Sequence, residues 1–409
     1  MKVNINLNNH LFIFLITGLL LSSNWIFSFS VFPNEDINLR VINEINDTSY
    51  FPLIKSFGDF NLNPSYQDGN DSLKLISFPA LSLLVDIFFF KIFGSYSFII
   101  IEFVSVFIFI NIFYYIFRTI DISKQLSLLF SLLLFIFPSF IDQIAFLDNN
   151  FIQKLNLNIS KFYGLRNPRP LITNLYLFIS LYYFIKIFYL EDKKLSTYII
   201  LGTIIGLTLH AFFYFFLFQS VLFLILYLKN HKLNIIKSFF ADLKKNLIFI
   251  SVILFFVTVL VLQLYLSEPD YKARLGIFHM NFDKKKLMFE YIINFFSKIE
   301  FIILFLLTNF MYFFVKKNPI NIFYYLFLST ILSTIIFITF YPTSIDYYFF
   351  FNWILLSGTL FVIISFFILA NKYLFVYWSN NKKFIFSTSF IVLIVLFFNY
   401  LSLKNKFID

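Results

Sequence analysis

The chain has 409 residues, of which 60% are hydrophobic, 23% aromatic and only 13% charged, and its mean hydropathy is +0.82. A soluble domain is typically about 45–50% apolar and about 25% charged, and its core could not bury so large an apolar surplus. The composition therefore excludes a water-soluble protein and predicts an all-α, polytopic membrane protein. The net charge of +10 must lie in loops, where it orients the helices or meets anionic lipid and phosphate.

Several kinds of chemistry are excluded by residues and motifs that the sequence lacks. It has no cysteine, which excludes disulfides, cysteine-ligated metals and thiol nucleophiles. It also contains no P-loop, HExxH or GxSxG pattern, the motifs of phosphate-binding loops, zinc proteases and α/β-hydrolases.

Apolar runs long enough to cross a bilayer, about 20 residues each, recur along the whole chain. We expect about eleven transmembrane helices, near residues 11–31, 98–117, 126–140, 171–190, 197–211, 212–228, 247–266, 299–315, 319–341, 349–370 and 384–401. The stretch 197–228 could equally be one long tilted helix or two short helices that meet around His210. The side of the membrane assigned to every later loop depends on this choice.

The first apolar run, 11–21, follows Lys2 and a polar stretch and is similar to a signal peptide. Because no small-x-small cleavage site follows it closely, we expect an uncleaved first helix. With the N-terminus inside, the short basic loops around Lys193 and at 229–245 lie on the cytoplasmic side, as the positive-inside rule favours. The longer segments 33–97, 141–170 and 267–298 then lie outside.

The first outer loop, 33–97, begins with two adjacent acids, Glu35 and Asp36, and Asp47 follows in the same acidic stretch. Adjacent carboxylates at a membrane surface suit a general base, because partial burial and like-charge repulsion raise one pKa towards the working pH. They suit a divalent cation equally well, and solvated loop acids remain an alternative. The metal requirement stays unknown.

The later part of this loop, 76–94, is apolar but is interrupted by Pro79, Asp86 and Lys91. A charge near the middle of the bilayer costs on the order of 2.5–3.5 kcal/mol by insertion scales. We therefore expect an amphipathic helix that lies at the outer surface and does not cross the membrane.

Two arginines, Arg166 and Arg169, precede the expected span at 171–190 and alternate with Pro168 and Pro170. Prolines stiffen the backbone, and the planar guanidinium matches phosphate oxygens. A lipid-linked phosphate at the membrane surface would need such a pair, although an ordinary head-group anchor would look the same.

Other candidate ligands are Lys272 and Arg274 in the segment 267–298, which could bind phosphate or form a solvated basic loop. His210 and Glu102 lie within apolar runs, where ionisable side chains are functional candidates. His210 could also be a simple helix-end residue.

The order of these features resembles the GT-C superfamily of membrane glycosyltransferases, which includes polyprenyl-phosphate-sugar-dependent mannosyl- and arabinosyltransferases. One helix leads to a loop that opens with paired acids, here Glu35-Asp36. A proline-led apolar segment ending in glycine follows, here Phe78-Pro79 through Phe93-Gly94, and then a span ending in Arg118. The segment from Arg166 to Thr173 is similar to a later part of the same pattern, and the resemblance covers roughly residues 10–230.

This resemblance implies a transferase that takes a sugar from a polyprenyl-phosphate donor and passes it to a glycan, lipid or protein acceptor. By resemblance Asp36 is the catalytic base, with Glu35 as its substitute, and Arg166 and Arg169 bind the donor phosphate. The expected partners are membrane lipid and these substrates, and no nucleic acid is expected. The resemblance implies no definite cofactor and leaves a divalent cation as an open alternative. The expected location is the bacterial inner membrane, with the active site facing outward.

For the domain organisation, the resemblance implies a catalytic module at 1–230 and further helices of the same membrane domain at 231–409. Three alternatives stay open. A lipid-linked glycan polymerase or ligase usually has its main outer loop late in the chain, whereas here the first loop, 33–97, is the longest. A transporter or flippase tends to show repeated halves and broken helices. A non-catalytic scaffold would not need Asp36.

Overall fold

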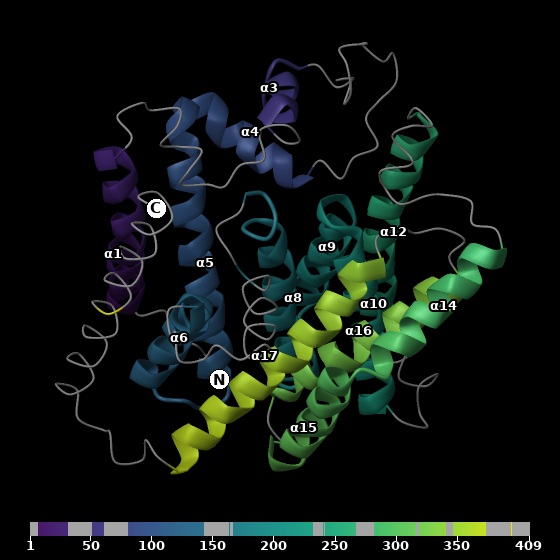
Figure 1. Cartoon of the computed structure of the whole chain (residues 1–409). Coiled ribbons are helices and arrows are strands. Elements are labelled where there is room, and N and C mark those ends of the chain that lie inside the picture. The colour runs from purple at the N-terminus through teal and green to yellow at the C-terminus, as the bar shows by residue number, and fades with distance from the viewer. Residues whose placement is uncertain are drawn as a thin grey trace. The chain divides into compact units, whose positions relative to one another are not determined.

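The computed structural model describes residues 7–31, 51–60, 81–142, 163, 167–231, 240, 242–266, 282–315, 319–340, 347–373 and 394. Within these ranges all regular structure is helical (Figure 1). The expected all-α class is therefore confirmed for the described part of the chain. A helix satisfies the backbone groups of its interior within its own segment, which is what a bilayer demands.

The chain divides into two compact units whose segments interleave along the sequence. Unit 1 comprises residues 1–47, 86–175 and 366–409, and unit 2 comprises 48–85 and 176–365. The predicted module boundary at residue 230 concerns the division of function along the chain and stays a prediction.

Unit 1 is built around helix α5 (Ser97–Thr119). Helices α1 (Leu7–Val31) and α6 (Lys124–Asp142) both pack against it. Phe109, Phe113 and Phe117 recur every fourth residue along α5 and are all fully buried, because a spacing of four keeps side chains on one face of a helix. Polar contacts add to this packing: His10 of α1 lies 2.7 Å from the Asn111 side chain of α5.

Unit 2 contains most of the remaining helices. They are α3 (Phe51–Gly58), α8 (Thr173–Phe188), α9 (Leu195–Ala211), α10 (Phe213–His231), α12 (Leu243–Tyr265), α14 (Phe282–Phe296), α15 (Ile299–Val315), α16 (Asn321–Phe340) and α17 (Tyr347–Tyr373). The first three residues of α8 and the end of α17 belong to unit 1. Helix α9 packs against both α10 and α12, and α10 packs against α16.

Five of the described helices are long and apolar enough to cross a membrane. They are Ser97–Thr119, Phe213–His231, Leu243–Gln263, Asn321–Thr339 and Phe349–Lys372. A sixth span is counted if α14 and α15, which meet at a 60° bend, form one broken crossing. The multi-pass membrane character is thus supported, whereas the expected eleven spans are not confirmed. Four further helices are apolar but shorter, and the run 384–401 lies outside the described residues.

The ambiguous stretch 197–228 forms two helices, α9 and α10, which are separated by Phe212. Phe212 has an extended backbone with φ −158° and ψ 97°. Thr208 and Gln219, on opposite sides of this break, are joined by a 2.9 Å hydrogen bond. Eleven residues of straight helix would hold them roughly 16 Å apart, so the chain reverses at Phe212.

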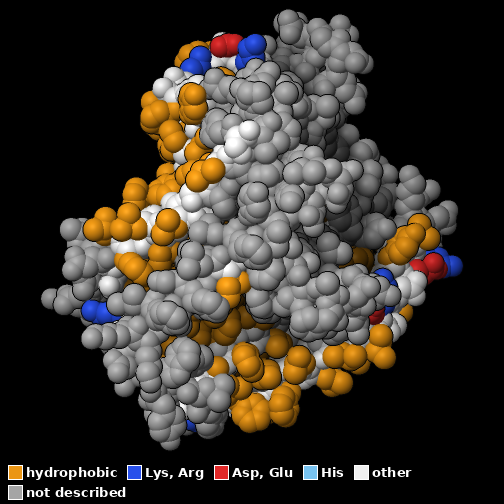
Figure 2. Space-filling view, turned by 60° about the vertical axis from the view of Figure 1, so that its left-hand side comes forward, with side chains coloured by type: hydrophobic (Ala, Val, Ile, Leu, Met, Phe, Trp, Pro, Cys, Tyr) orange, Lys and Arg blue, Asp and Glu red, His pale blue; other side chains and the backbone are white. Residues whose placement is uncertain are grey.

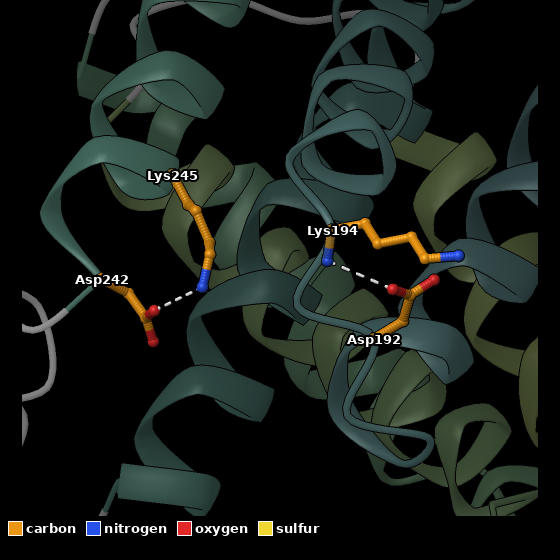
Figure 3. A network of polar contacts seen from close by, with 4 residues as sticks. All are labelled: Asp192, Lys194, Asp242 and Lys245. Atoms are coloured by element: carbon orange, nitrogen blue, oxygen red, sulfur yellow. Dashed lines mark hydrogen bonds and ion pairs between the residues drawn. The ribbon is translucent and has the colours of Figure 1, made fainter.

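The short loops of unit 2 that carry the basic residues gather at one end. Asn230, at the end of α10, donates to the Phe188 carbonyl at the end of α8. Asp192 accepts from the Lys194 backbone before α9, and Asp242 pairs with Lys245 at the start of α12, as Figure 3 shows. The expectation that the basic loops around Lys193 and at 229–245 share one side is consistent with this arrangement of their described residues, while the side of the membrane stays a prediction.

Apolar side chains cover much of the described surface (Figure 2). In α12 only 11% of the most apolar stretch is buried, against 67% in α16 and α17. Leu254, Phe255 and Leu262 of α12 are more than half exposed. Water would penalise such a surface, whereas lipid does not.

The expected helix in 76–94 is present as α4 (Leu81–Phe93), which has 13 residues and is too short to cross a bilayer. Gly94 ends it with φ +56°, a backbone conformation that favours glycine. The exposure of its two faces is the reverse of that of an amphipathic helix in water. Leu84, Phe88 and Ile92 are exposed along one stripe, while Asp86 is buried.

Candidate functional site

Three of the candidate residues that the sequence singles out lie within the described ranges, namely Glu102, Arg169 and His210. The others lie outside those ranges, namely Glu35, Asp36, Asp47, Arg166, Lys272 and Arg274. The site can therefore be built from its described neighbours in unit 1, beginning with the segment that carries Arg169.

Arg169 lies in a turn, 167–170, that is hydrogen-bonded to the start of α8. The Ile172 N–H donates to the Pro168 carbonyl at 3.0 Å, and the Asn174 N–H donates to the Pro170 carbonyl at 3.1 Å. Arg169 itself is half-buried. The two prolines restrict the backbone on either side of Arg169. The hydrogen bonds to residues 172 and 174 restrict the same turn further.

The residue before Pro168, Asn167, is bound to a buried carboxylate. Its Nδ2 donates to Oδ1 of Asp86 at 2.6 Å. Asp86 is fully buried and Asn167 is 1% exposed. This bond joins two segments that are 81 residues apart in sequence, and both belong to unit 1.

A second buried acid, Glu102 of α5, lies close to the same segment. Its Oε2 accepts a 3.3 Å hydrogen bond from Trp25 of α1. Tyr163, which precedes the turn by a few residues, stacks on Phe109 of α5 with ring centroids 4.2 Å apart. Burial and the nearby Glu102 carboxylate raise the pKa of Tyr163 well above its ordinary value. Tyr163 and Asn167 therefore each lie beside a buried acid, Glu102 of α5 and Asp86 of α4.

Burial raises the pKa of Asp86 to about 7, although the Asn167 hydrogen bond opposes the shift. Helix α4 is not one of the membrane-spanning helices. Among the described residues, neither the second oxygen of Asp86 nor Oδ1 of Asn167 has a hydrogen-bond partner. A carboxyl that titrates near neutral pH can hold or release a proton under working conditions, and buried unpaired oxygens favour the protonated form.

Sequence reasoning recognised Asp86 only as the charge that keeps 76–94 from crossing the membrane. It included Asn167 in the proline-arginine segment without giving it a role. The available signal was an acid in an otherwise apolar helix, but nothing in the sequence pairs it with a residue 81 positions away.

His210 is placed in unit 2, where its Nε2 lies 3.0 Å from the Phe256 carbonyl of α12. Its ring also packs at 6.0 Å from the Phe256 ring. These contacts join α9 to α12 and account for a histidine at a helix end. A substrate-binding role for His210 remains a prediction.

A metal site would need several acidic or histidine ligands close together. Within the described ranges no three His, Asp or Glu side chains come together in this way. Glu35, Asp36 and Asp47 lie outside those ranges, so the possible divalent cation of the first outer loop stays untested.

These observations define the chain as a multi-pass helical membrane protein with a buried acid–amide pair beside a stiff arginine-bearing turn. Known protein families, characterised proteins and solved structures give no match to this chain. Its function must therefore be argued from its own residues.

Proposed function

We propose that this chain is a membrane glycosyltransferase that moves a sugar from a polyprenyl-phosphate carrier to an acceptor glycan, lipid or protein at the outer face of the membrane. The observation that carries the proposal is the turn 167–170. It places Arg169 between two prolines, and a buried acid, Asp86, fixes its first residue. A phosphate attached to a lipid needs a stiff, cationic group beside an apolar surface.

The resemblance to the GT-C superfamily gives this site its chemistry. In the proposed reaction an acceptor hydroxyl oxygen attacks the anomeric carbon of the donor sugar. The bond from that carbon to the phosphate oxygen breaks, and its electron pair leaves with polyprenyl phosphate. Asp36 takes the proton from the hydroxyl, while Arg169 and Arg166 stabilise the charge that grows on the leaving phosphate.

The apolar surface described above is consistent with a substrate that carries a lipid chain. The exposed stripe of Leu84, Phe88 and Ile92 on α4 gives an isoprenoid chain an apolar helix to lie against, on the same helix that holds Asp86. The sugar, the acceptor and the linkage are left open by the proposal.

The test is a reconstitution assay. Purified protein in liposomes is mixed with a panel of polyprenyl-phosphate sugars and candidate acceptors, and release of free polyprenyl phosphate is measured. We expect turnover by the wild type and a loss of about a thousandfold or more in Asp36→Asn, a range typical for removal of a catalytic base. Asp59→Asn, which changes another acid of the first outer loop, is the matched control and should retain activity.

Equal turnover in wild type and Asp36→Asn would move the base to another residue, with Glu35 next. A lipid-linked glycan polymerase or ligase would instead release polyprenyl pyrophosphate from an oligosaccharide donor. A transporter or flippase would move a lipid or solute across the liposome membrane without releasing any product. The described features that favour a transporter are the break at Phe212 and the 60° bend between α14 and α15. However, the buried polar side chains near Phe212 bond to one another, which disfavours a solute site at that break.

A further inference from the structure

We propose that Asp86 is a positioning residue, which holds Arg169 in place through Asn167 and thereby sets the affinity of the chain for the phosphate of a polyprenyl monophosphate. This inference rests on the proposed function, because Arg169 is taken there as a ligand of the donor phosphate. It assigns a role to a residue that neither the sequence motifs nor the proposed reaction uses.

The first step is the geometry of the connection. Asn167 is bound to Asp86 at 2.6 Å and is buried with it. Only Pro168 separates Asn167 from Arg169, and its ring fixes one backbone angle of the link. The other end of the turn is hydrogen-bonded to α8. A shift of Asn167 would therefore be transmitted to Arg169, since the backbone between them has little freedom to absorb it.

The second step concerns the two oxygens of the pair that have no hydrogen-bond partner among the described residues. Oδ2 of Asp86 and Oδ1 of Asn167 are both acceptors and both buried, so neither can satisfy the other while Asp86 is charged. A neutral carboxylic acid has one O–H donor, and a carboxylic acid and a primary amide can pair through two hydrogen bonds. Protonation of Asp86 would complete the pair, in line with its raised pKa of about 7.

Other titratable groups occur on the elements around Asp86 in unit 1. They are Lys91 on α4, Glu102, Tyr114, Tyr115 and Arg118 on α5, and Tyr163 and Arg169 in the segment before α8. The shift of the Asp86 pKa itself has two causes, burial and the Asn167 hydrogen bond. The pair should consequently hold the turn best below neutral pH and lose part of this hold as pH rises through about 7.

The experiment measures binding of a radiolabelled long-chain polyprenyl monophosphate to the full-length protein in nanodiscs of a neutral phospholipid. Neutral polyprenol serves as the competitor that lacks phosphate. Asp86→Leu removes the hydrogen bond, and we expect it to weaken binding about tenfold, the effect of losing one hydrogen bond with a charged partner. Asp86→Asn imitates the protonated acid, so it should bind like wild type at low pH. Between about pH 6 and 8 it should keep only the pH dependence that comes from the ligand phosphate, whose second pKa is about 6.

A double-mutant cycle tests whether Asp86 acts through Arg169. Arg169→Gln alone should weaken binding, and adding Asp86→Leu to it should weaken binding no further, because the group that Asp86 positions is already gone. A merely structural role would give additive losses. Thr208→Val is the control, since it removes a buried hydrogen bond of unit 2 and should leave the affinity unchanged.

The outcomes separate the two proposals. If the wild type does not distinguish polyprenyl phosphate from polyprenol, the proposed function is wrong and this inference falls with it. If the wild type binds but Asp86→Leu binds equally well, or the cycle is additive, only the positioning role is overturned. Should Asp86→Leu fail to fold, a wild-type affinity that changes with pH in the same way as that of Asp86→Asn overturns the positioning role as well.

Discussion

Two buried polar clusters, one in each unit, differ in whether their hydrogen bonds are complete. In unit 2, Gln219 donates to Ser180 at 3.0 Å and accepts from Thr208 at 2.9 Å. All three side chains are fully buried and each of them has a partner. In unit 1, Asp86 and Asn167 share one hydrogen bond and leave two oxygens without a partner among the described residues.

This difference in hydrogen bonding indicates that the two clusters have different roles. A closed network in an apolar interior specifies how helices pair and leaves nothing for a ligand to complete. An open pair is costly to bury and persists where a proton, a substrate or a neighbouring segment completes it. The contrast supports the positioning role proposed above for the acid–amide pair and a role in helix packing for the Gln219 network.

The largest effect is expected from Asp86→Asn. Because the folded-state pKa of Asp86 is raised from 3.8 to about 7, the folded wild type loses stability as pH rises from about 4 to about 7. The loss is on the order of 4 kcal/mol at most, since one pKa unit corresponds to about 1.4 kcal/mol. The variant has no such loss, so its thermal midpoint in detergent should exceed that of wild type at pH 8 and match it at about pH 4. A constant difference at both pH values would contradict a charged, buried Asp86.

A smaller effect is expected from Gly206→Ala, which probes close packing in unit 2. A Cβ at this position would overlap the Phe256 ring of α12, so that ring or the two helices would have to shift. Overpacking of this kind typically costs about 1–3 kcal/mol, and the thermal midpoint should fall. Gly18→Ala in α1 is the control, because its nearest contact is an ordinary 3.7 Å. Equal midpoints for the two variants would argue against the close contact between α9 and α12.

The smallest effect is expected from Gln219→Leu. It removes the bonds to Ser180 and Thr208, but both hydroxyls keep a backbone carbonyl as partner. The loss should be about 1–2 kcal/mol, and it should not depend on pH or change polyprenyl-phosphate binding. A marked loss of binding would remove the contrast between the two clusters and favour a ligand site in unit 2.

Much of the helical architecture follows from local sequence. Five of the expected spans correspond to long apolar helices, because about 20 consecutive apolar residues have one stable way to satisfy their backbone in lipid. The expected helix in 76–94 also exists as α4. Span number was harder to predict, since helices such as α8 and α9 are apolar but shorter than a bilayer requires.

The candidate site was predictable only in part. The stiff segment around Arg169 could be read from alternating prolines and arginines, whereas the Asp86–Asn167 bond joins residues far apart in sequence and leaves no local pattern. The acids at Glu35 and Asp36 remain predictions, as they lie outside the described residues.

The sequence by itself determined the solvent and the class of this protein, because composition decides whether apolar surface can be hidden from water. It also determined most helix positions, since those depend on hydrophobic runs and turn residues. Tertiary structure decided which face of α4 is buried, that the chain reverses at Phe212, and that Asp86 meets Asn167. Each of these depends on packing between distant segments, where the burial of a polar group is allowed only if a partner arrives from elsewhere in the chain.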